Sequence, residues 1–130
     1  MKQKKGFTLI EILVVTTIIA VLAVGAFVSF ASAGKSARDS RRKTDLETVR
    51  QAMVLYKAET GCYPSGDYAT AVGALVGGGY LSNPAPSDPK PSTHSYVYAP
   101  GGVCTGGAAT FTLSVNPTLE GGSTYEVRNP

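Results

Sequence analysis

Glu11 is the residue whose surroundings most need a chemical explanation. It is the only charged residue between Phe7 and Gly34, and the 23 residues from Ile12 to Gly34 that follow it are uncharged and rich in Ile, Leu, Val and Ala. A carboxylate inside a membrane-spanning segment costs several kcal/mol unless it has a partner. We therefore expect Glu11 to be paired and to have a functional role.

The two cysteines are the second feature with chemical potential. Cys62 and Cys104 form the only possible pair in the chain. Basic residues ahead of an apolar run are typical of an export signal, and an even cysteine count in an exported chain favours a disulfide over a metal site. Such a bridge would be worth about 4 kcal/mol on the chain-entropy estimate. Two free buried thiols are the alternative interpretation.

No set of side chains in the sequence predicts catalysis. His94 is the only histidine, no Cys/His set has metal-ligand spacing, and no motif places a pair of carboxylates. Gly34-Lys35-Ser36 looks like the end of a phosphate-binding loop, but that motif needs a glycine where Ser29 stands. We therefore expect no enzyme activity, no catalytic residue, no metal and no cofactor.

The overall charge does not predict a nucleic-acid partner. The formal net charge is +3, from 12 basic and 9 acidic residues, and Lys2, Lys4 and Lys5 supply the excess. The basic residues that follow Gly34 are interleaved with acidic ones, which favours a solvated collar. That collar comprises Arg38, Arg41, Arg42 and Lys43 together with Asp39, Asp45 and Glu47.

The apolar stretch that positions Glu11 is long enough to cross a bilayer as a helix. An ordinary secretory signal peptide is the rival interpretation, since Ala31-Ser32-Ala33 fits a small-x-small cleavage site and cleavage after Ala33 would release a soluble binding domain. The apolar core of such a signal runs over about 7 to 15 residues, which is much shorter than this stretch. A permanent single-span anchor is a further alternative.

The run Lys5-Gly6-Phe7-Thr8-Leu9-Ile10-Glu11-Ile12-Leu13-Val14-Val15 resembles the leader of type IV pilins and of the pseudopilins of type II secretion systems. The resemblance implies that a prepilin peptidase cuts after Gly6, methylates the new N-terminal residue Phe7 and requires Glu11. It also implies assembly with other pilin subunits into a filament, by a platform driven by an ATPase.

Cleavage after Gly6 would give Glu11 a counter-charge. The new amine at Phe7 would lie at one end of the apolar helix, and the Glu11 carboxylate could neutralise the amine of a neighbouring subunit in an apolar filament core. We expect the leader to be cytoplasmic and the subunit to lie in membrane lipid before assembly, because the leader motif requires a peptidase on that side and the cysteine pair belongs outside a reducing cytosol.

The elements that follow complete a predicted α+β fold. A helix from about Phe7 to about Ala58 has no proline, and a later apolar stripe on it, Leu46, Val49, Met53 and Tyr56, predicts packing against a small sheet. Strand patterns occur at 95–99, 109–115 and 124–128. We read residues 1–6 as leader, 7–34 as the transmembrane and filament-core half of the helix, and 35–130 as a globular pilin-like domain whose small antiparallel sheet packs on the second half of the helix.

The sequence thus predicts a structural subunit of a type IV pilus or a pilus-like filament. A pseudopilin of a type II secretion or competence system is the alternative within the same family, and the soluble secreted domain is the alternative outside it. Pseudopilins of this kind often bind calcium in an acidic C-terminal loop. Here the tail offers only Glu120 and Glu126, with Asp88 upstream, so we expect no calcium site.

Overall fold

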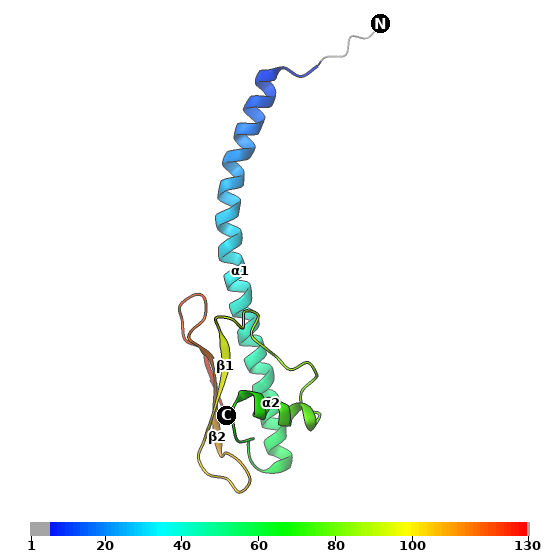
Figure 1. Cartoon of the computed structure of the whole chain (residues 1–130), viewed down its shortest axis with the longest axis vertical. Coiled ribbons are helices and arrows are strands. Elements are labelled where there is room, and N and C mark those ends of the chain that lie inside the picture. Colours follow the sequence, from blue (N-terminus) through cyan, green and yellow to red (C-terminus); the bar gives the residue numbers. More distant parts are fainter. Residues whose placement is uncertain (1–5, 130) are drawn as a thin grey trace. The chain divides into compact units, whose positions relative to one another are not determined.

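A computed structural model describes residues 6–129 of the chain; Lys2, Lys4 and Lys5 of the predicted leader lie outside the described residues. The elements follow the order α1, α2, β1, β2, β3 (Figure 1). The chain divides into two compact units, and the boundary in the sequence falls between Lys35 and Ser36. The predicted α+β class, with a long helix and a small antiparallel sheet, is confirmed.

Helix α1 extends over Leu9–Thr60, close to the predicted limits. In the N-terminal unit its large apolar side chains are exposed, among them Leu22, Phe27 and Phe30. Of the helices in the described residues, α1 is the one long and apolar enough to cross a membrane. So many exposed apolar groups along one segment need lipid or protein to cover them.

The second part of α1 belongs to the C-terminal unit and buries the predicted stripe. Leu46, Val49 and Met53 are fully buried in the hydrophobic core, and Tyr56 packs against it from a partly buried position. The helix ends where Gly61 takes a positive φ of 86° and its N–H donates to the carbonyl of Lys57 at 2.8 Å. Glycine favours this conformation because it has no Cβ.

The three predicted strands form one antiparallel sheet in the order β1-β2-β3. Their bounds are Ser95–Gly101, Thr110–Asn116 and Glu126–Arg128, within two residues of those predicted. Alternate residues face the core, and the register places Leu113 opposite both Tyr98 and Val127. The core-facing residues are Tyr96, Tyr98, Phe111, Leu113, Val115 and Val127.

Helix α2, Tyr68–Gly77, was not predicted, because the glycines around it read as irregular chain. Asp67 caps it by accepting a hydrogen bond from the backbone N–H of Thr70 at 2.9 Å. The helix buries Ala71, Val72 and Leu75, a spacing of one helical face. The cap residue and this spacing were the sequence signals that could have revealed it.

Candidate functional site

The Gly6–Phe7 peptide bond lies in irregular backbone just before α1. The side chain of Phe7 is 85% exposed, and a Cβ placed on Gly6 would meet no atom within 4 Å. A peptidase binds its substrate as an extended and accessible segment, which a helical backbone does not provide. The local geometry is therefore compatible with cleavage between these two residues.

Glu11 lies in the first turn of α1 and is hydrogen-bonded to Thr8. Its carboxylate accepts from the Thr8 backbone N–H at 2.9 Å and from the Thr8 hydroxyl at 2.8 Å. The backbone N–H of Glu11 donates in turn to the Thr8 hydroxyl at 3.3 Å. This reciprocal arrangement is a capping box, which satisfies the free N–H groups at the start of a helix.

Sequence reasoning predicted that Glu11 needs a partner but missed this local one. The signal was present, because a threonine followed three residues later by a glutamate at the start of an apolar run is the capping-box pattern. Both hydrogen-bond donors that Thr8 supplies are neutral. The capping box therefore orients the carboxylate toward the helix N-terminus and leaves its negative charge in place.

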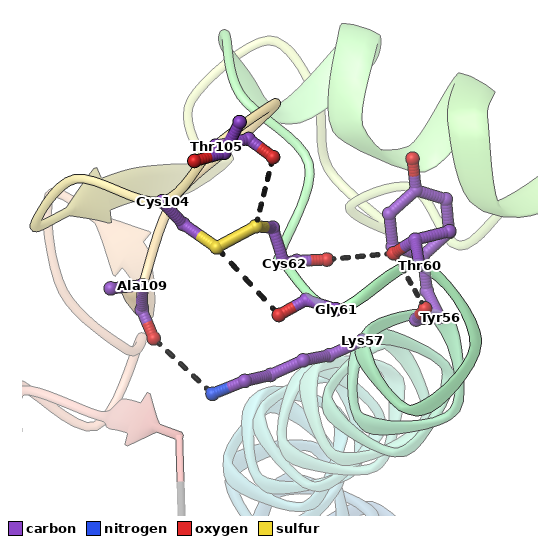
Figure 2. The surroundings of a disulfide bond; sticks show 8 residues. All are labelled: Tyr56, Lys57, Thr60, Gly61, Cys62, Cys104, Thr105 and Ala109. Carbon is purple, nitrogen blue, oxygen red and sulfur yellow. Dashed lines mark hydrogen bonds between the residues drawn. A yellow bond between two sulfur atoms is a disulfide. The ribbon is translucent and has the colours of Figure 1, made fainter.

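Cys62 and Cys104 are joined by a disulfide, with their Cα atoms 5.9 Å apart. Figure 2 shows how it connects the chain just after α1 with the loop between β1 and β2. Next to it, the Lys57 ammonium donates to the Ala109 carbonyl at 3.4 Å and lies 4.5 Å above the ring of Tyr63. The end of α1 is thus attached to this loop by both covalent and polar contacts.

A buried cluster of charges around Arg42 was not predicted. The Arg42 side chain is fully buried and forms a two-pronged contact with Asp88, Nε to Oδ2 at 2.8 Å and Nη2 to Oδ1 at 3.0 Å. Its Nη1 donates to Asp39 at 2.8 Å and to Glu120 at 3.1 Å. Arg38 Nε also donates to Glu120, at 2.6 Å. We call these five residues the Arg42 cluster.

The Arg42 cluster fixes two loops onto α1. Asp39 accepts the backbone N–H groups of Glu120 and Gly121, both at 2.9 Å, and so holds the loop between β2 and β3. Asp88 accepts the backbone N–H of Lys90 at 2.7 Å and holds the segment before β1. Two stretches with little regular structure are thereby attached to one turn of a helix.

The contacts within the cluster favour the charged forms. Hydrogen bonds from Arg38, with help from Arg42, lower the pKa of Glu120 to about 2 against the opposing effect of burial. Burial raises the pKa values of Asp39 and Asp88, but hydrogen bonds from Arg42 and from backbone N–H groups outweigh it and both values lie below normal. Hydrogen bonding to Asp88, against burial, raises the pKa of Arg42.

The prediction of a solvated collar was therefore wrong for Arg42 and Asp39, which are buried. It holds for Arg41 and Lys43, which are exposed. The acidic partners Asp88 and Glu120 come from distant parts of the chain, so the local charge pattern could not reveal them. Within residues 6–129, no group of three or more His, Cys, Asp or Glu side chains is arranged to hold a metal ion.

Comparison with known proteins adds to this geometry. Residues 1–27 match the family model described as the prokaryotic N-terminal methylation motif. The chain is 36% identical over 64 residues to type II secretion system core protein G of Pseudomonas aeruginosa. The aligned segment covers 49% of this chain and 45% of that protein. It is 29% identical over 109 residues to the protein of the same name from Vibrio cholerae, covering 75% and 73% respectively. No solved structure matches significantly.

Proposed function

We propose that the chain is a structural subunit of a pilus-like filament, since its N-terminus matches the prokaryotic N-terminal methylation motif and it is similar to two proteins named type II secretion system core protein G. One observation carries this proposal: an exposed Gly6–Phe7 bond directly precedes a helix whose apolar first part is uncovered within the N-terminal unit. In this proposal a prepilin peptidase cuts after Gly6 and methylates Phe7. The freed helix then packs against the helices of other subunits.

In the assembled filament, the Glu11 carboxylate pairs with the Phe7 amine of a neighbouring subunit. Two features support this pairing. The capping box directs the carboxylate toward the end of the helix where the amine is created. The surrounding side chains, Ile10 and Ile12, are apolar, and in such surroundings an ion pair is far less costly than two separate charges.

Before assembly, we place the subunit in the cytoplasmic membrane with its N-terminus inside and its C-terminal unit outside. The length and apolar character of α1 support a membrane span, and the disulfide supports an oxidising compartment for the C-terminal unit. An ATPase-driven assembly platform would then extract the subunit from the lipid into a filament, which would be periplasmic or extracellular.

Within the family, the relatives favour a pseudopilin of a type II secretion system, since both matched proteins are named as its core protein G. The match to the Pseudomonas protein spans less than half of that protein's length. A type IV pilus subunit is the second candidate, because the methylation motif is the feature that matches the family model. Filament length and subunit abundance separate the two.

The first test is intact mass and N-terminal sequencing of the protein from its native cell envelope. The proposal predicts a chain that begins at Phe7 and carries about 14 Da from one methyl group. A chain that begins at Gly34 would instead identify a secreted soluble domain, and an intact Met1 would identify a permanent anchor. The matched variant is Gly6→Val, which should retain the leader without disturbing the fold, since a Cβ at Gly6 has open space.

A further inference from the structure

The loop between β1 and β2 exposes an apolar side chain beside the disulfide. Val103 is 98% exposed, the highest value for a large apolar side chain in the described residues. Gly102 and Gly106 flank it with positive φ angles of 66° and 101° and make the chain turn sharply. We call residues 102–106 the tip loop. Its valine contributes nothing to the core and is free to contact another molecule.

The base of this loop is positioned by contacts that do not involve sulfur. Tyr63 and Ala108 exchange two backbone hydrogen bonds of 2.9 Å, and both residues are buried. Tyr63 also packs edge-on against Phe111, with ring centroids 4.6 Å apart. Gly107 fits closely, since a Cβ there would lie 2.2 Å from the Tyr63 carbonyl oxygen. These contacts position the two cysteines near each other without relying on the bond between them.

The two cysteines differ in accessibility. Cys62 is 6% exposed and follows the end of α1, whereas Cys104 is partly exposed and is adjacent to Val103 in the tip loop. The sulfur of Cys62 is 3.5 Å from the Thr105 carbonyl oxygen, so the loop backbone lies against it (Figure 2). A thiol can exchange with an external disulfide only if that disulfide reaches the sulfur. Cys104 is the thiol that meets this condition.

We propose that the tip loop is the docking segment for a thiol oxidase, a protein with a reactive disulfide, and that Cys104 reacts with it first. The Cys104 thiolate attacks one sulfur of the oxidase, which releases the other as a thiol and leaves a mixed disulfide. The Cys62 thiolate then attacks the Cys104 sulfur and releases the second oxidase thiol. Two electrons pass to the oxidase, and both cysteine protons pass to solvent or to its thiolates.

Val103 is the apolar contact that this oxidase would use. An oxidase must reach the sulfur that it oxidises, and the tip loop places an exposed valine directly before the partly exposed Cys104. Docking would bury the Val103 side chain against the oxidase. This removes apolar surface from water, which favours binding. The inference depends on the disulfide and not on filament assembly, so either proposal can fail without the other.

The order of reaction is tested with the full chain in detergent micelles and glutathione disulfide as the probe. In Cys62→Ser only Cys104 can react, and in Cys104→Ser only Cys62 can. Both variants lose the same cross-link, so each is the control for the other. We expect Cys62→Ser to gain glutathione about tenfold faster, as measured by intact mass. Equal rates, or a faster Cys104→Ser, would overturn the assignment.

The docking role of Val103 is tested by oxidising the reduced full chain with two oxidants. One is a purified thiol oxidase of the thioredoxin fold in its disulfide form, and the other is glutathione disulfide. Val103→Ser should slow oxidation by the protein several-fold and leave oxidation by glutathione disulfide unchanged. Leu55→Ser, at another exposed apolar residue of the same unit, should change neither rate. The proposal is overturned if Val103→Ser slows neither oxidant, or slows both equally.

Discussion

Replacing Arg42 by methionine is the sharpest test of how the C-terminal unit is held together. Methionine is long and uncharged and can fill most of the space of the buried side chain without its five donors. The substitution removes the cation that three carboxylates share, those of Asp39, Asp88 and Glu120. Removing one member of a buried ion pair leaves an uncompensated charge in a poorly solvated place.

The size of the effect follows from what each carboxylate retains. Glu120 keeps Arg38, and Asp39 keeps two backbone N–H donors. Asp88, whose side chain is almost fully buried, loses both of its contacts with Arg42 and keeps only the backbone N–H of Lys90. The loss is therefore dominated by one stranded carboxylate. We expect Arg42→Met to reduce the free energy of unfolding by about 3–5 kcal/mol.

Urea unfolding followed by tyrosine fluorescence measures this change. The chain has seven tyrosines and no tryptophan, and all the tyrosines follow Lys35, so the signal reports the C-terminal unit even when the full chain is in micelles. Arg41→Met is the matched control. Arg41 is exposed and its closest contact with Asp45 is 3.8 Å, so its loss should cost less than about 1 kcal/mol.

The pH dependence gives the result that would refute this reasoning. In the wild type the carboxylate pKa values are lowered, so their stabilisation is present above the unfolded-state pKa of about 4 and is lost as the pH falls toward 2. In Arg42→Met, burial dominates at Asp88, and protonation relieves the stranded charge. The stability gap between the two proteins should therefore shrink below about pH 4. A gap that stays constant down to pH 2 would exclude the stranded carboxylate as its cause.

Three further outcomes can be measured directly. Glu11→Ala should leave the protein in the membrane fraction but reduce filaments seen by electron microscopy, because the Phe7 amine loses its proposed partner; normal filaments would contradict the charge pairing. Replacing both Cys62 and Cys104 by serine should lower the free energy of unfolding by about 4 kcal/mol for a loop of this length, measured by urea unfolding. Asp67→Ala should cost about 1 kcal/mol by removing the cap of α2, with Asp67→Asn close to wild type as the control, also by urea unfolding.

The parts of the fold that were predictable from sequence are those whose signal is local. The stripe of Leu46, Val49 and Met53 repeats at helical spacing, and Phe111 and Leu113 alternate with threonines along β2. Each pattern identifies the buried face before any partner is known. Helix α2 was missed because its interior and its end contain glycines, which weaken helix propensity, although tertiary packing and the Asp67 cap compensate.

The parts of the site that were not predictable depend on long-range contacts. Arg42 pairs with Asp88, 46 residues away, and with Glu120, 78 residues away. Along the sequence the same arginine stands among charges of both signs, which is the usual pattern of an exposed helix face. Burial of the guanidinium arises only when two loops fold over it. The disulfide was predictable despite its span of 42 residues, because two cysteines allow only one pairing.

Because of the capping box, Glu11 needs a positive charge from a neighbouring subunit and no further hydrogen-bond donor. Thr8 already provides two hydrogen bonds, so the carboxylate is not unsatisfied in the single subunit. Both donors are neutral, however, and a carboxylate with neutral partners still carries its full charge into an apolar surrounding. A cation removes that penalty without protonation of the carboxylate, and no basic residue lies between Phe7 and Gly34. Cleavage after Gly6 would replace the neutral amide at Phe7 with an amine, and this places a positive charge at the end of the helix toward which the capping box directs Glu11.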